Sequence, residues 1–218
     1  MSKIFQIQLF VFLFGIGFSL HAQENTKETP ILSNQSLKKI KIGLFYSLDK
    51  NLSDKSQSTS KYEGYAAEYN KHNYSLGTEI EYKPNSKFSI QSGLTYSIRD
   101  FTGTFYCHVC DFIAAPQPED INQQFLEIPL TAKYYFLSKK VLLFAEAGFI
   151  NQFIIKNKLN ENNYNANAKA ALGVGYQFDN SYSIEISTNY QSGISNLYKN
   201  SNFKQQLLGF KVGIKKEL

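Results

Sequence analysis

Histidine and cysteine are scarce in this chain of 218 residues, which contains three His and two Cys. After residue 22 the only histidines are His72 and His108. A hydrolase needs a nucleophile with a base beside it, and His72, with Ser75 and Glu68 nearby in the sequence, matches no triad spacing. The sequence therefore predicts a non-enzymatic protein, with no residue assigned as catalytic.

Several other features are missing. No second long apolar run follows residue 22, which excludes membrane-spanning helices in that part of the chain. A phosphate-binding loop is missing too, because Gly173 and Gly175 fall inside a strand pattern. The net charge is +5, but the lysines are scattered through the strands instead of forming a patch. We therefore expect no cofactor, no metal ion and no nucleic-acid partner.

The N-terminus has the form of an export signal. Lys3 supplies the positive end, residues 4–20 are almost entirely apolar, and Ala22 offers a small residue for cleavage. A membrane anchor is the alternative, but the run is short for a span and no basic stop-transfer cluster follows it. No Cys follows the run either, which argues against a lipid-modified N-terminus. The expected organisation is a signal peptide at 1–22, a flexible periplasmic lead-in at 23–37 and one barrel domain at 38–218.

Apolar and polar residues alternate, with a period of two, along much of the chain. In residues 74–83 (YSLGTEIEYK), Tyr74, Leu76, Ile80 and Tyr82 fall on one face, and small or charged residues fall on the other. Successive side chains of a strand point to opposite faces, so this period predicts a β-strand. The pattern recurs about eight times, the number of strands in the smallest outer-membrane barrels. The expected strands are 38–50, 72–83, 87–100, 123–137, 141–155, 167–178, 181–193 and 204–216.

Short and long connections alternate between these strands. The short ones are 84–86, 138–140 and 179–180, and the long ones are 51–71, 101–122, 156–166 and 194–203. Tight turns at one end and long loops at the other are typical of outer-membrane barrels. The sequence predicts an all-β fold, an eight-stranded antiparallel up-and-down transmembrane β-barrel with short periplasmic turns and long extracellular loops. A soluble barrel or sandwich, with the charged face in water, is the alternative.

The polar faces of the expected strands carry charges of both signs, which would point into the lumen. An enclosed charge is costly unless it is paired, so we predict ion pairs and hydrogen bonds across the lumen. Such an interior would be plugged, and a narrow pore is the alternative. The predicted interior network consists of Lys39, Lys41, Glu79, Glu81, Arg99, Glu127, Lys133, Glu146, Lys169, Glu185 and Lys211.

The motif Cys107-His108-Val109-Cys110 lies in the second long connection. Haem attachment requires a His directly after the second Cys, where this chain has Asp111. An exported loop favours a local disulfide between Cys107 and Cys110. Free or intermolecular thiols, a metal site and a redox motif are the alternatives.

Aromatic residues are frequent in the first two long connections. Those residues are Tyr62, Tyr65, Tyr69, Phe101, Phe105, Tyr106 and Phe112. They fit either a binding surface or an extension of the aromatic girdle at the membrane interface. The expected partners are outer-membrane lipid and a protein contacted through the extracellular loops.

The segment FLEIPLTAKYYF at 125–136 resembles the YLEIPLLLKYYF strand of the PorT-like outer-membrane β-barrel family of Bacteroidetes-type bacteria. The segment VLLFAEAG at 141–148 is similar to the strand that follows in that family, and GVGY at 173–176 resembles a later one. The resemblance implies an outer-membrane location and an OmpA/OmpX-like eight-stranded layout. It also implies a structural, partner-binding or secretion-accessory role in the cell envelope.

Overall fold

The computed structural model describes residues 39–111, 115–156, 159, 161–178 and 181–218. The expected signal peptide (1–22) and lead-in (23–37) lie outside these residues. Within the described part of the chain, no helix has the length and apolarity needed to cross a membrane.

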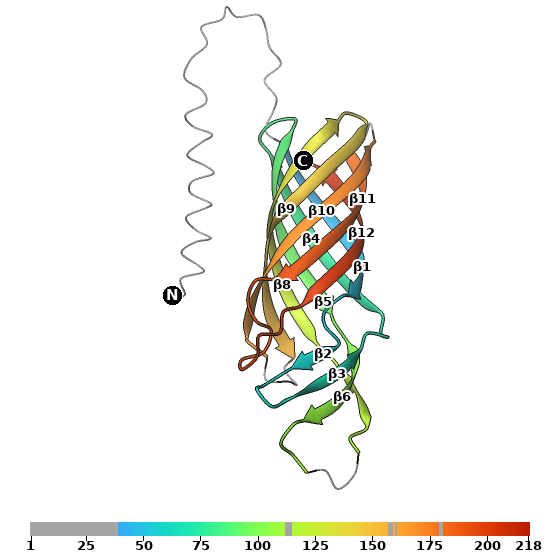
Figure 1. The fold of residues 1–218 in the computed structure, drawn as a ribbon. Helices are drawn as coiled ribbons and strands as arrows, with labels where there is room; N and C mark the ends of the chain where they lie inside the picture. The colour runs from blue at the N-terminus through green and yellow to red at the C-terminus, as the bar shows by residue number, and fades with distance from the viewer. Residues whose placement is uncertain (1–38, 112–114, 157–158, 160, 179–180) are drawn as a thin grey trace, which may run out of the picture. The chain divides into compact units, whose positions relative to one another are not determined.

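Eight antiparallel strands form a closed barrel in the order β1-β12-β11-β10-β9-β8-β5-β4 (Figure 1). The strands are β1 (Lys39–Asn51), β4 (Asn73–Lys83), β5 (Phe88–Ile98), β8 (Gln124–Ser138), β9 (Val141–Lys156), β10 (Tyr164–Gln177), β11 (Tyr182–Gly193) and β12 (Gln206–Glu217). The first and last strands close the barrel, with Leu44 opposite Ile214. Closure leaves no unpaired strand edge for lipid to cover. The predicted barrel is confirmed, and the largest boundary error is at β10, which begins at Tyr164 instead of 167.

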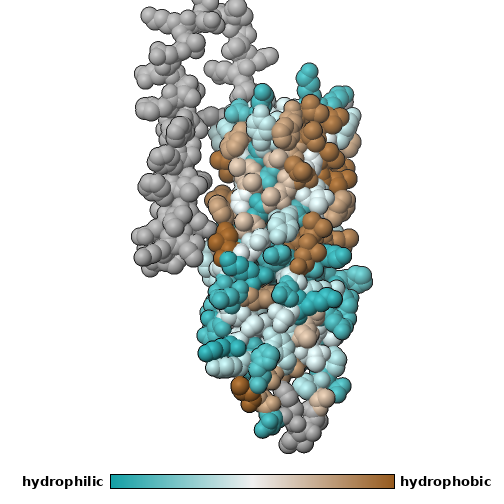
Figure 2. Space-filling view, viewed as in Figure 1, coloured by the Kyte–Doolittle hydropathy of each residue, from teal (hydrophilic) through white to brown (hydrophobic). Residues whose placement is uncertain are grey.

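The apolar faces of the strands lie outside and the polar faces inside. Along β1, Ile42 and Leu44 are 45% and 60% exposed, whereas Lys41 and Phe45 are 2% and 8% exposed. Figure 2 shows apolar side chains gathered over the outside of the barrel and mainly hydrophilic ones over the loop end. An exposed apolar surface of this extent is typical of lipid contact and not of a soluble sandwich.

Aromatic side chains mark both borders of the apolar band. Tyr176 and Phe178 pack edge to face at 5.1 Å near the end of the barrel that carries the tight turns. Tyr46 and Tyr74 stack at 5.9 Å near the end that carries the long loops. Tyrosine and phenylalanine at these two levels form the girdles that meet the lipid headgroups.

Ile186 lies midway between the two girdles, because Tyr182 and Tyr190 stand four positions before and after it on β11. We expect Ile186→Arg to lower the free energy of unfolding by about 2–4 kcal/mol, the cost of arginine at the bilayer midplane. Denaturant titration of the barrel folded into lipid vesicles measures the change. Ile194→Arg is the matched control, since Ile194 is 43% exposed but lies beyond Tyr190 at the loop end. Equal unfolding midpoints for the two variants would contradict the placement of Ile186 at the middle of the membrane.

The long connections are more ordered than the sequence predicts. Four short strands form an antiparallel sheet in the order β2-β3-β6-β7 at the loop end of the barrel (Figure 1). They are β2 (Ser56–Ser58), β3 (Glu63–Glu68), β6 (Phe101–Cys107) and β7 (Pro118–Ile121). The sequence predicts no strand within the long connections 51–71 and 101–122, so these four were missed. These strands escaped detection because they are short and carry little regular apolar alternation.

Candidate functional site

Among the described residues, six cationic and six anionic side chains are deeply buried in the barrel interior. All twelve are at most 9% exposed, and we call them the lumen network. The cations are Lys41, Arg99, Lys133, Lys169, Lys211 and Lys215, and the anions are Asp49, Glu79, Glu81, Glu127, Glu146 and Glu185. Their formal charges cancel, which reduces the cost of enclosing so many of them.

Lys215 is the most connected cation of the lumen network. Its Nζ lies 2.6 Å from Glu81, 3.1 Å from Glu185 and 3.3 Å from Glu79. It also donates a hydrogen bond to Gln91 Oε1 at 3.0 Å. One ammonium group thus binds carboxylates from β4 and β11, which do not neighbour each other in the barrel wall.

Lys133 makes a second bridge across the same part of the lumen. Its Nζ lies 2.8 Å from Glu185 and 3.7 Å from Glu81. The Tyr135 hydroxyl donates to Glu81 Oε1 at 2.5 Å, so this carboxylate accepts a hydrogen bond from a neutral group in addition to its ion pairs. The Lys133 ammonium also lies 4.2 Å from the centre of the Phe144 ring, where a cation–π contact adds to the ion pairs.

Two further ion pairs occupy the middle of the lumen. Lys211 binds Glu79, and Gln91 donates its amide to the same carboxylate at 2.8 Å. Lys169 lies 2.7 Å from Glu146.

Arg99 organises the loop end of the lumen. Its guanidinium lies 2.9 Å from Asp49 and 3.5 Å from Glu127. Ser75 donates to Asp49 at 2.5 Å, and Gln152 donates to Glu127 at 3.1 Å. Charged and neutral groups together satisfy these buried carboxylates, as a low-dielectric interior requires.

The structure places ten of the eleven residues predicted for the interior in the lumen. The exception is Lys39, which begins β1 and whose side chain lies outside the described residues. Sequence reasoning omitted Asp49 and Lys215 from the network. Strand parity was the available signal, because each lies an even number of residues from a predicted member, Lys41 or Lys211, on the same strand.

Little space remains inside the barrel. A cavity of about 30 Å³ lies among Phe45, Glu79, Lys211 and their neighbours. That cavity has room for a few water molecules. Around the ion pairs, side chains that are 0% exposed fill much of the described lumen. They include Glu81, Gln91, Arg99 and Lys133.

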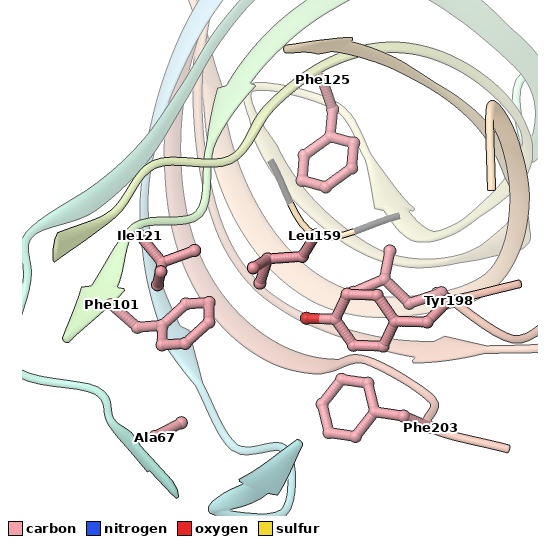
Figure 3. Packing of buried hydrophobic residues seen from close by; sticks show 8 residues of the cluster. Ala67, Phe101, Ile121, Phe125, Leu159, Tyr198 and Phe203 are labelled. Atoms are coloured by element: carbon pink, nitrogen blue, oxygen red, sulfur yellow. The ribbon is translucent and has the colours of Figure 1, made fainter. Parts of the chain in front are cut away.

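A hydrophobic cluster lies under the short sheet at the loop end, and we call it the cap core. Its members come from four strands and from the segments around 159 and 194–205, and all are at most 8% exposed. Figure 3 shows Phe101, Leu159, Tyr198 and Phe203 directed toward one another across the end of the barrel. The residues of the cap core are Ala67, Phe101, Ile121, Phe125, Leu159, Leu197, Tyr198 and Phe203.

Hydrogen bonds, several of them buried, connect the segments of the cap. Tyr198 donates to Gln57, and Gln123 donates its amide to Glu161 at 3.2 Å. Tyr69 donates to the Asp54 carbonyl at 2.7 Å. Burial raises the pKa of Tyr69 to about 12, so its hydroxyl keeps the proton that it donates at neutral pH. The cap is therefore a packed and hydrogen-bonded layer.

Cys107 and Cys110 are joined by a disulfide, with their Cα atoms 5.5 Å apart. Glu63 lies close to both sulfur atoms. Disulfide sulfurs provide no thiolate ligand, so this oxidised arrangement offers no zinc site of the usual type.

The aromatic residues of the long connections divide between the cap interior and its surface. Phe101 is fully buried in the cap core, whereas Tyr62 is 46% exposed. Tyr65 and Phe105 pack edge to face at 5.6 Å within the short sheet. Phe112 lies outside the described residues. Several of these rings therefore stabilise the cap itself, a role that the sequence did not suggest.

Comparison with known proteins agrees with this architecture. A family model described as "Outer membrane protein beta-barrel domain" matches residues 10–215. The outer membrane protein OprG from Pseudomonas aeruginosa is similar with a TM-score of 0.53 and 12% identity, over 87% of this chain and 99% of that chain. Neisserial surface protein A is similar with a TM-score of 0.50 and 10% identity, over 82% of this chain and 97% of that chain. No curated protein sequence matches the chain. At these identities the likeness to the solved structures shows the fold alone.

Proposed function

Because the chain belongs to the outer membrane protein β-barrel domain family, we propose that it is a sealed, non-enzymatic barrel that displays an ordered cap at the cell surface. The barrel resides in the outer membrane, contacts lipid through its apolar band and encloses buried ion pairs. The cap is the part that meets a partner. Residues 1–22 are proposed to direct export, ahead of a lead-in at 23–37.

The observation that carries this proposal is the pairing of charges across the whole lumen. Arg99 pairs with Asp49 near the loops, and Lys215 pairs with Glu81 near the turns. Lys133 pairs with Glu185 from a strand three places away in the barrel wall. A conducting pore needs a continuous column of water, and these groups occupy the place where that column would run. The cap core covers the loop end above them.

We expect no steady single-channel current when the purified barrel is inserted in planar bilayers at neutral pH. The physical reason is the filled lumen, in which Lys133 and Glu81 are 0% exposed. Folding of the same preparation is verified by the different gel mobility of the heated and unheated protein, and insertion by protease protection of the barrel in vesicles of the same lipid. Stepwise currents that persist at neutral pH would contradict the sealed lumen and favour the narrow-pore alternative.

We also propose that the chain belongs to the PorT-like group within its family. Support comes from the Glu127-Ile128-Pro129-Leu130 core of β8 and from the strand that follows it. A secretion-accessory role is the second candidate function that this resemblance favours. Deletion of the gene followed by measurement of secreted type IX cargo distinguishes it, since a structural barrel leaves secretion unchanged.

A further inference from the structure

A polar groove opens in the cap between β2 and the segment 196–206. Its volume is about 640 Å³. Ligand-binding clefts commonly measure about 300–1,000 Å³, so the groove is large enough for a small oligosaccharide. Its lining combines serine, asparagine, glutamine and lysine residues with Phe203.

The charge of the groove is positive. Lys61, Lys199 and Lys204 line it, whereas Asp54 is its one carboxylate. Within the described part of the chain, no ion pair joins these three lysines to a carboxylate, and Lys61 lies 5.2 Å from the centre of the exposed Tyr62 ring. Exposed lysines that converge on a concave surface attract phosphate, sulfate or carboxylate groups.

The neutral groups of the groove suit a carbohydrate. Hydroxyls and primary amides both donate and accept hydrogen bonds, as the hydroxyls of a sugar ring require. Phe203 also lines the groove, but only 8% of it is exposed and its ring packs against Tyr198 in the cap core, 5.6 Å between ring centres. The polar groups therefore supply the contacts for a sugar, and Phe203 anchors the wall of the groove to the cap core.

Backbone hydrogen bonds hold the walls of the groove in place. The amide of Leu197 donates to the Phe203 carbonyl at 2.9 Å and closes the segment between them. The amide of Leu52 donates to the Gln206 carbonyl at 2.8 Å, which joins that segment to the end of β1. A groove ordered before binding loses less conformational entropy when a ligand enters.

We propose that this groove binds an anionic carbohydrate, with Lys61, Lys199 and Lys204 contacting its phosphate, sulfate or carboxylate groups. This inference rests on the proposed function, because it names the ligand class of the surface that the sealed barrel displays. Two kinds of molecule carry these groups on a sugar. They are the headgroups of glycolipid in the outer leaflet and a soluble acidic polysaccharide.

Titration calorimetry on the full-length folded barrel in detergent micelles tests the proposal. The probes are a short dextran sulfate, a phosphorylated lipopolysaccharide core oligosaccharide and uncharged dextran of the same length. We expect at least one charged probe to bind and the uncharged dextran not to bind. Binding of the core oligosaccharide alone assigns the glycolipid source, whereas binding of dextran sulfate assigns the soluble polysaccharide source.

A pair of double variants tests the location. Lys199→Glu with Lys204→Glu is expected to weaken binding by roughly tenfold or more, since two charge-assisted contacts become repulsive. Lys87→Glu with Lys139→Glu makes the same change of net charge at the tight turns and is expected to bind like the unaltered protein.

Three outcomes would overturn the inference. They are no binding of either charged probe, equal binding of uncharged dextran, and equal weakening by the two double variants. The bilayer current, measured on the same preparation, tests the sealed barrel independently of carbohydrate binding. A barrel that carries no current and binds no probe remains sealed but lacks the carbohydrate site.

Discussion

Replacing Lys215 with methionine is expected to lower the free energy of unfolding of the barrel by about 3–5 kcal/mol, the usual cost of breaking a buried ion pair from one side. Lys215 neutralises Glu81, Glu185 and Glu79 at 2.6, 3.1 and 3.3 Å. These three carboxylates are at most 2% exposed, so water cannot take the place of the ammonium group. Methionine keeps most of the side-chain volume and removes the charge, which separates electrostatic from packing effects.

Denaturant titration of the barrel refolded in lipid vesicles measures this loss. Lys216→Met is the matched control, because the neighbouring side chain points outward, 5.7 Å from the centre of the Tyr182 ring. We expect that control to change stability by less than about 0.5 kcal/mol. Adding Glu81→Gln to the Lys215→Met barrel should recover part of the loss, because it removes one of the unpaired carboxylates. Equal midpoints for the two single variants would contradict the role of Lys215.

The barrel was predictable from the sequence because lipid and lumen impose opposite chemistry on alternate residues. A strand such as β4, with Leu76 and Ile80 on one face and Glu79 and Glu81 on the other, specifies its orientation by itself. The tight turns then set the register of each hairpin locally. Residue parity also indicates which side chains enter the lumen, including Asp49 and Lys215.

The pairing of charges inside the lumen could not be predicted in the same way. Lys133 and Glu146 stand directly opposite each other on β8 and β9, which makes them the obvious pair in the sequence. In the structure Lys133 lies 2.8 Å from Glu185, and Glu146 lies 2.7 Å from Lys169. Lys133 and Glu185 lie on β8 and β11, which are not neighbours and which the tilt and stagger of the closed barrel bring within reach across the lumen. Glu146 and Lys169 lie on the neighbouring strands β9 and β10, in a diagonal pair that strand register alone does not select over Lys133.

The cap escaped sequence analysis for a related reason. Its sheet pairs β3 with β6, so that Glu63 stands opposite Cys107 from a different connection. Such pairing is non-local, and neither segment shows enough alternation to indicate a strand. The aromatic residues were visible in the sequence, but only the packed structure distinguishes the buried Phe101 from the exposed Tyr62.

Phe101→Ala is expected to destabilise the cap by about 3–5 kcal/mol, the usual cost of removing a fully buried phenyl ring. Phe101 is 0% exposed and packs edge to face on Tyr69, with ring centres 6.2 Å apart. Because the lumen network lies below the cap, the barrel should stay folded while the cap opens. We therefore expect faster proteolysis within 51–71 and 101–122, with the mobility of the unheated barrel on gels unchanged. Tyr62→Ala, at a site 46% exposed, is the control and should leave proteolysis unchanged.

The same variant separates the two layers that close the barrel. If the paired charges of the lumen are sufficient to block ion flow, the Phe101→Ala barrel carries no steady current in planar bilayers even though its cap is open. Glycan binding should fall at the same time, because Phe203, which lines the polar groove, belongs to the cap core that Phe101 supports. A steady current from Phe101→Ala would instead assign the seal to the cap. Joint loss of cap and barrel at one denaturant concentration would show that they unfold as one cooperative unit, contrary to the independence argued above.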